Sequence, residues 1–131
     1  MKKVRGYIYS RSFMGERVPQ HVQNIVVRDY CGHNNLYFLL SAAEYAMADS
    51  DLMLEQVLVE LKDIDGIVAY SIFQLPEDSI KRHRIYHQIV EMKKNLYFAL
   101  EGLSLSTNQD CERIEILWRV RQTLPNCIKY I

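Results

Sequence analysis

The chain has 131 residues, of which 49% are hydrophobic and 24% charged. This balance excludes an intrinsically disordered chain, and the length favours a single globular domain over residues 1–131. Sixteen basic residues balance sixteen acidic ones, so the formal net charge is zero. A neutral chain argues against nonspecific binding to nucleic acid or membranes, because such binding needs excess positive charge.

Cysteine content and hydropathy indicate the compartment. The three cysteines, Cys31, Cys111 and Cys127, are widely spaced and form neither a disulfide framework nor a zinc-ribbon pattern. No apolar run approaches the roughly 20 residues that span a bilayer. The first residues also lack the uninterrupted apolar stretch of a signal peptide. We therefore expect a soluble protein of the cytoplasm.

The first half of the chain alternates between strand and helix patterns. Residues 4–9 are β-branched and aromatic and predict a strand, which a polar loop follows. Pro19 suits the first turn of a helix that ends near Gly32. The apolar run at 36–40 predicts a strand covered on both faces, and residues 41–50 are expected to form a loop.

The second half continues this alternation. Asp51 stands where the N-cap of a second helix belongs, and residues 67–70 predict a third buried strand. Acidic residues at 77–78 begin a third helix. Residues 96–100 predict a fourth strand, and a last helix follows that ends at Pro125. Strands alternating with helices indicate right-handed βαβ crossovers. The expected fold is therefore a three-layer α/β/α domain with a mainly parallel sheet of four to five strands.

The topology also predicts where a ligand binds. In an open parallel sheet, ligands bind beyond the carboxyl ends of the strands. The loops after the four strands, with the helix start that follows the first of them, bring hydroxyls, carboxylates, amides and guanidinium groups to that edge. These candidates are Ser10, Arg11, Ser12, Arg17, Gln20, Glu44, Ser71, Gln74 and Glu101.

The residue types suggest separate roles at this edge. Arg11 and Arg17 are expected to clamp a phosphate, because a guanidinium is a two-pronged donor. Glu44 is the expected acid–base group, and Gln74 would orient substrate hydroxyls. The remaining candidates are expected to contact substrate. The competing interpretation is ordinary loop composition, in which hydroxyls cap helices.

Metal and cofactor sites are not expected. His83, His87 and Glu91 have a helical spacing that could hold a metal, but Lys81, Arg82 and Arg84 indicate a solvated, positively charged helix face instead. The loop after the first strand lacks the glycine-rich pattern that binds dinucleotides. The chain also has no nucleophile-elbow or Walker-type motif.

The order of the elements resembles the catalytic domain of serine recombinases, the resolvase and invertase family. The likeness lies in the Gly-Tyr start of the first strand and in residues 65–75 and 89–107. That family's Tyr-x-Arg-x-Ser pattern reads YIYSR at residues 7–11, which loses the arginine and shifts the serine. The second arginine-bearing loop reads FQLPED at 73–78. The resemblance thus implies a resolvase-like fold without recombinase activity.

Three stretches, residues 5–24, 40–47 and 65–76, are similar to a small family of uncharacterised bacterial proteins from sporadic carbohydrate gene clusters. That resemblance implies a role in making surface polysaccharide, such as lipopolysaccharide O-antigen, but no known reaction.

Two functions from different classes are therefore predicted. The first is an accessory protein that binds or modifies a sugar phosphate or a nucleotide sugar. The second is a noncatalytic interaction or regulatory module, a homodimer through the last helix with Trp118, Ile116 and Val120 at the contact. Neither has nucleic acid or a membrane as a partner.

Overall fold

The computed structural model describes residues 1–47 and 50–128, with side chains up to residue 123. Strands and helices alternate along most of the chain, as the sequence predicts. The elements are β1 (Lys2–Tyr9), α1 (Gln20–His33), β2 (Leu36–Glu44), α2 (Leu52–Glu60), β3 (Gly66–Ala69), the short 3-10 helix η1 (Ile72–Gln74), α3 (Ser79–Glu91), β4 (Asn95–Phe98), β5 (Leu103–Leu105) and α4 (Asn108–Ile128).

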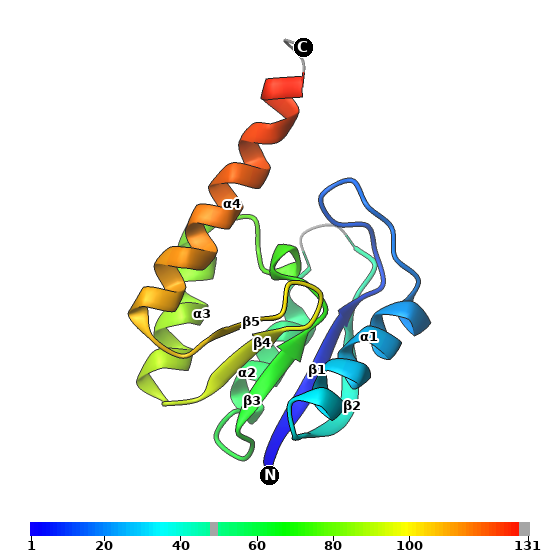
Figure 1. Cartoon of the computed structure of the whole chain (residues 1–131), viewed down its shortest axis with the longest axis vertical. Helices are drawn as coiled ribbons and strands as arrows, with labels where there is room; N and C mark the ends of the chain where they lie inside the picture. The colour runs from blue at the N-terminus through cyan, green and yellow to red at the C-terminus, as the bar shows by residue number, and fades with distance from the viewer. Residues whose placement is uncertain (48–49, 129–131) are drawn as a thin grey trace.

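The five strands form one sheet in the order β2-β1-β3-β4-β5, in which only β5 is antiparallel to its neighbour. Helix α1 covers one face of the sheet, and α2 and α3 cover the other (Figure 1). The α/β class, the three layers and the mainly parallel sheet are therefore confirmed. The parallel strands direct their carboxyl ends toward one edge, as ligand-binding α/β sheets do.

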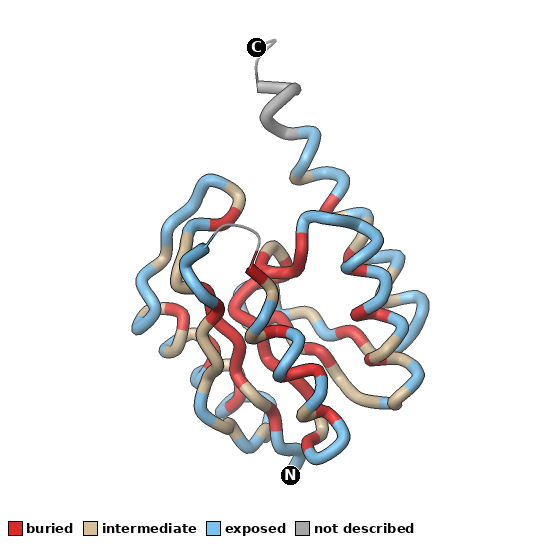
Figure 2. Tube along the Cα trace, turned by 180° about the vertical axis from the view of Figure 1, so that it is seen from behind, coloured by how far each residue is buried: buried red, intermediate tan, exposed pale blue. Residues whose placement is uncertain are grey.

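The core lies along β1 and β3. All four residues of β3 are buried, and so are Val4, Tyr7 and Ile8 of β1. Figure 2 shows this buried interior as a red band through the middle of the molecule. A strand buried on both faces reads as a continuous apolar run, which is why residues 67–70 could be recognised from sequence.

Strand β2 differs from its prediction. It is an edge strand, on which Tyr37 and Leu40 are exposed, so the expectation that both faces are covered is wrong. It also continues to Glu44 through a bulge opposite Gly6, where a loop was expected. An apolar run cannot by itself distinguish an edge strand from a central one, and pairing with β1 extends the strand.

The end of the chain also differs. Gly102, with φ of 66°, turns the chain after β4 into the short antiparallel β5, which the strand pattern did not indicate. Helix α4 runs past Pro125 to Ile128 and projects beyond the sheet, where an end at Pro125 was expected (Figure 1). A proline removes one N–H from the helical ladder, but here the helix continues beyond it. Across the described residues, none of the helices is both long and apolar enough to cross a bilayer.

Candidate functional site

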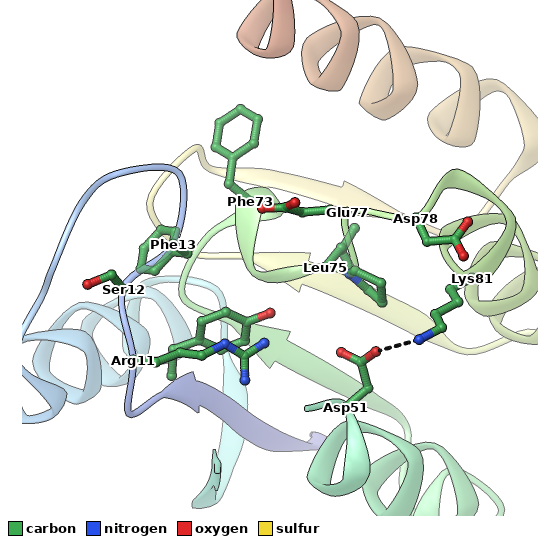
Figure 3. A pocket seen from close by; sticks show the side chains of 11 residues that line it. Arg11, Ser12, Phe13, Asp51, Phe73, Leu75, Glu77, Asp78 and Lys81 are labelled. Carbon is green, nitrogen blue, oxygen red and sulfur yellow. Dashed lines mark hydrogen bonds and ion pairs between the residues drawn. The ribbon is translucent and has the colours of Figure 1, made fainter. Parts of the chain in front are cut away.

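An open pocket of about 410 Å³ lies at the carboxyl ends of β1 and β3, beside the first turns of α2 and α3 (Figure 3). Its volume falls within the range of small-molecule sites. The pocket is where the sheet topology predicts a ligand. Its lining residues are Tyr9, Arg11, Ser12, Phe13, Asp51, Phe73, Leu75, Pro76, Glu77, Asp78 and Lys81.

Arg11 is held firmly at this pocket. Its Nη1 donates to the backbone carbonyls of Tyr45, Met47 and Ser50 at 3.0, 3.3 and 3.0 Å. Its guanidinium also lies over the ring of Tyr9, 4.3 Å from the centroid. Burial raises the pKa of Tyr9 to about 12, although Arg11 opposes the shift. The side chain therefore places a fixed positive charge next to a neutral phenol.

The opposite wall carries a carboxylate and an ammonium group. Lys81 Nζ lies 3.5 Å from Asp51 Oδ2, and the two side chains point toward each other in Figure 3. Burial raises the pKa of Asp51, whereas Lys81 lowers it. Asp51 makes no side-chain hydrogen bond as the N-cap of α2, so the capping role expected from sequence is wrong. Its carboxylate instead lines the pocket.

Glu44 provides the cap that Asp51 was expected to give. Its buried carboxylate accepts the backbone N–H groups of Met53 and Leu54 at 3.2 and 3.1 Å, the first turn of α2. The hydroxyls of Tyr7 and Ser50 and the N–H of Tyr45 also donate to it. Burial alone would raise the pKa of Glu44, but these hydrogen bonds outweigh it and lower the pKa. Glu44 is thus an ionised structural anchor, and it does not line the pocket.

Ser71 and Glu101 contact each other rather than the pocket. Ser71 Oγ donates to Glu101 Oε2 at 2.7 Å, and the N–H of Ile72 donates to Glu101 Oε1 at 3.0 Å. Ser71 Oγ also accepts the N–H of Phe73 at 3.2 Å. These bonds fasten η1 to the turn between β4 and β5. They position Phe73, which lines the pocket, without bringing either predicted residue into it.

Gln74 is buried beneath the pocket. Its Nε2 donates to Gln23 Oε1 at 2.7 Å, and its backbone carbonyl accepts a hydrogen bond from the hydroxyl of Tyr9 at 2.6 Å. Gln23 in turn pairs with both the N–H and the carbonyl of Tyr9 at 2.9 Å. Gln74 Oε1 has no hydrogen-bond partner among the described residues. This amide pair holds the end of β1 against α1 and η1.

Sequence reasoning missed Gln23, although a signal was present. It lies on the same helical stripe as Val27 and Cys31, which are buried with it. A polar side chain on an apolar stripe needs a buried partner. Here the partners are the backbone of Tyr9 and the amide of Gln74.

The other candidates divide between the pocket and the surface. Ser12 lines the pocket, whereas the hydroxyl of Ser10 donates to the carbonyl of Glu44. Arg17 and Gln20 are exposed and lie outside the lining. Of the predicted residues, the structure thus brings Arg11 and Ser12 into the pocket. Asp51, Glu77, Asp78 and Lys81 were missed, because they lie at the starts of the second and third helices, which were not counted among the segments at this edge.

Arg82 corrects the interpretation of the basic run on α3. It is only 2% exposed, so the solvated face expected from sequence is wrong at this residue. Its Nε and Nη2 bind the two oxygens of Glu115 at 2.8 and 2.9 Å, and its guanidinium lies 4.3 Å from the ring centroid of Trp118. Nη1 donates to the carbonyls of Pro76 and Glu77. Arg82 therefore joins α4 to the wall of the pocket.

The histidines of α3 remain on the surface. His83 and His87 are exposed, and His87 Nε2 lies 3.2 Å from Glu91 Oε1. Within the part of the chain that the structure describes, no group of three histidine, cysteine or acidic residues could hold a metal ion. His83, His87 and Glu91, whose spacing was noted in the sequence, therefore do not form such a group.

Comparison with solved structures identifies the fold. The chain is similar to a resolvase family site-specific recombinase from Streptococcus pneumoniae, with 9% identity, a TM-score of 0.64 and 97% of each chain covered. It is also similar to the N-terminal catalytic domain of TP901-1 integrase, with 11% identity and a TM-score of 0.61 over 94% of this chain and 98% of that one. The fold is that of a resolvase catalytic domain.

Sequence comparison adds no family to this fold. No protein-family model matches the chain, and no curated protein sequence is similar to it. The structural likeness, at these low identities, concerns the fold alone, because one fold hosts many activities. Function therefore has to be argued from the residues of the pocket.

Proposed function

We propose that the chain binds a phosphorylated sugar, either a sugar phosphate or a nucleotide sugar, in the pocket at the carboxyl edge of the sheet. The observation that carries this proposal is the convergence of two cations and three carboxylates on one open pocket. Arg11, in the loop after β1, and Lys81, in the first turn of α3, supply positive charge, and Asp51, Glu77 and Asp78 supply acceptors. The cations can bind a phosphate, and the carboxylates can accept hydrogen bonds from sugar hydroxyls.

Arg11 retains donors for a ligand. Only its Nη1 makes hydrogen bonds to the described residues, so Nε and Nη2 keep their N–H groups. Because the loop carbonyls and the ring of Tyr9 already fix the guanidinium, little side-chain entropy is lost when it binds an anion. A prepositioned arginine is a strong site for a phosphate group.

The rest of the pocket suits a sugar ring. Ser12 offers a hydroxyl, and the acidic residues offer carboxylate oxygens. Phe13, Phe73 and Leu75 supply apolar surface beside these polar groups. Sites for small ligands commonly combine an apolar wall with a few converging polar groups. The same ligand class would suit the accessory role in surface-polysaccharide biosynthesis that the carbohydrate-cluster resemblance implies.

The test is calorimetric titration of the purified chain with glucose 1-phosphate, glucose 6-phosphate and uridine diphosphate glucose. The variant Lys81→Gln should weaken binding about tenfold, since one phosphate contact is worth roughly 1.4 kcal/mol. Lys62→Gln removes the same charge from an exposed position outside the pocket and should bind as the wild type does. Absence of binding by all three compounds would contradict the proposal.

A second candidate is an interaction module that acts through α4. Ile116 and Val120, four residues apart on this projecting helix, are 53% and 52% exposed (Figure 1). Trp118, which was expected to share this contact, is buried against η1 and donates to the carbonyl of Ile72 at 3.1 Å. Light scattering should give twice the 15.5 kDa mass for the wild type and 15.5 kDa for Val120→Glu. A monomeric wild type would contradict this candidate.

A further inference from the structure

A second, smaller pocket of about 160 Å³ adjoins the first. It lies between α2 and α3, and its lining shares Asp51, Pro76 and Lys81 with the larger pocket. The two pockets are therefore neighbouring spaces that meet at the Asp51–Lys81 ion pair. The remaining lining residues are Leu54, Glu55, Leu58, Arg84, Ile85 and Gln88.

We propose that this smaller pocket holds the base of a nucleoside diphosphate sugar, whose sugar occupies the larger pocket and whose diphosphate lies beside Lys81. The proposal rests on the proposed function and deepens it. It selects nucleotide sugars over simple sugar phosphates, because a sugar phosphate would leave the smaller pocket empty.

The walls of the smaller pocket are partly apolar. Leu54, Leu58 and Ile85 supply aliphatic side chains. A pocket of this volume is well below the size of an independent small-molecule site, which is roughly 300 Å³ or more. It can therefore accept one part of a larger ligand. An aromatic base buries apolar faces against such walls.

The rim of the smaller pocket offers polar groups to the edge of a base. Arg84 and Glu55 are exposed at the rim, one from α3 and one from α2. Gln88 Nε2 donates to the carbonyl of Leu58 at 3.2 Å, which fixes the amide and leaves its oxygen as an acceptor. Bases are recognised by stacking on guanidinium planes and by hydrogen bonds to their edges. The rim supplies donors and acceptors for both.

The junction suits a diphosphate. Lys81 is half-exposed there, and its 3.5 Å contact with Asp51 leaves other N–H donors of the ammonium group for an anion. The N-terminal ends of α2 and α3 are already capped by the carboxylates of Glu44 and Asp78, so the ammonium group of Lys81 is the cation that faces the diphosphate at this junction. A diphosphate at Lys81 would then connect a sugar in one pocket to a base in the other.

Calorimetric titration of the full chain tests this inference, with glucose 1-phosphate, uridine diphosphate glucose and adenosine diphosphate glucose as probes. The variant Glu55→Trp places a large side chain at the rim of the smaller pocket, and Gln56→Trp places it at the next exposed position of α2, outside the lining. We expect at least one nucleotide sugar to bind about tenfold more tightly than glucose 1-phosphate. Glu55→Trp should remove that advantage, and Gln56→Trp should keep it.

The outcomes separate this inference from the proposed function. Equal affinities for glucose 1-phosphate and both nucleotide sugars would overturn the inference and leave sugar-phosphate binding intact. A nucleotide-sugar advantage that survives Glu55→Trp would overturn the assignment of the base to the smaller pocket. Absence of binding by all three probes would overturn the proposed function as well.

Discussion

The hydroxyl of Tyr7 on β1 donates to the carboxylate of Glu44 at 2.9 Å, in the interior beneath the first turn of α2. This contact joins two neighbouring strands to the helix that follows the second of them. Because Glu44 satisfies the N–H groups of that helix, Asp51 is released from capping and faces the pocket. Glu44, expected to be the acid–base group, is thus the structural cap of α2, and Asp51, expected to be that cap, lines the pocket.

Glu44→Gln should destabilise the protein by about 2–4 kcal/mol, because an amide offers one acceptor oxygen where five donors now meet two. Chemical denaturation measures the change. Glu55→Gln, on the surface of the same helix, is the matched control and should change stability by less than about 0.5 kcal/mol. A Glu44→Gln protein as stable as the wild type would show that the carboxylate is free for another role.

The stability of the wild type should fall as the solution is acidified below about pH 4.5. The pKa of Glu44 in the folded protein lies below its ordinary value of 4.5, and those of Glu115 and Asp110 are lowered as well. Groups with a lowered pKa stabilise the fold above their unfolded pKa, and that contribution is lost as the pH falls through the folded value. Asp51, whose pKa is raised, contributes with the opposite sign.

Denaturation curves between pH 3 and pH 7 test this dependence. The Glu44→Gln variant should show a shallower loss of stability on acidification than the wild type, because one of the titrating carboxyls is gone. Parallel curves for the two proteins would contradict the assignment of acid sensitivity to Glu44.

Arg82→Met should destabilise the protein by roughly 3–5 kcal/mol, since it leaves the largely buried carboxylate of Glu115 without its cationic partner. The double variant Arg82→Met with Glu115→Leu should recover part of this loss, because no unpaired charge remains. Arg119→Met, at an exposed position of α4, is the control and should be nearly neutral. Denaturant unfolding curves of the wild type and the three variants measure these differences in the free energy of unfolding. Equal stability of Arg82→Met and Arg119→Met would show that the cluster contributes little.

Two glycines offer an independent check of the packing. A Cβ added at Gly6 would lie 2.8 Å from Phe38 Cε1 and even closer to Ser41, so Gly6→Ala should cost about 1–3 kcal/mol. Nothing lies within 4 Å of the corresponding position at Gly32, near the end of α1. Gly32→Ala should therefore be neutral or stabilising by up to about 1 kcal/mol. Thermal unfolding compares the two, and a harmless Gly6→Ala would contradict the close approach of β1 and β2.

The fold class could be predicted from the sequence because the central strands are recognisable as uninterrupted apolar runs. Residues 67–70 are apolar without interruption and prove buried on both faces. The continuation of β2 to Glu44 was not visible, because Ser41-Ala42-Ala43 carries no strand pattern and depends on pairing with β1. Strand β5 was missed for a similar reason, since three residues are too few to show a period.

The position of the candidate site could be predicted from the sequence, but most of the residues that line it could not. The edge of the sheet follows from strand direction, which located Arg11 and Ser12. Which polar residues are buried depends on tertiary partners that no local pattern shows. Arg82 stands in a basic run that reads as solvated, yet Glu115 and Trp118, more than 30 residues away along the chain, enclose it.

The most direct test of ligand binding at this edge is a nuclear magnetic resonance titration of the isotopically labelled chain with uridine diphosphate glucose. Backbone signals of Arg11, Ser12, Asp51 and Lys81 should shift with a single saturating dependence on ligand concentration, and those of Lys62 and Arg119 should not. An unchanged spectrum at millimolar ligand, or shifts confined to residues outside the two pockets, would contradict the proposal that this resolvase-like fold binds a phosphorylated sugar.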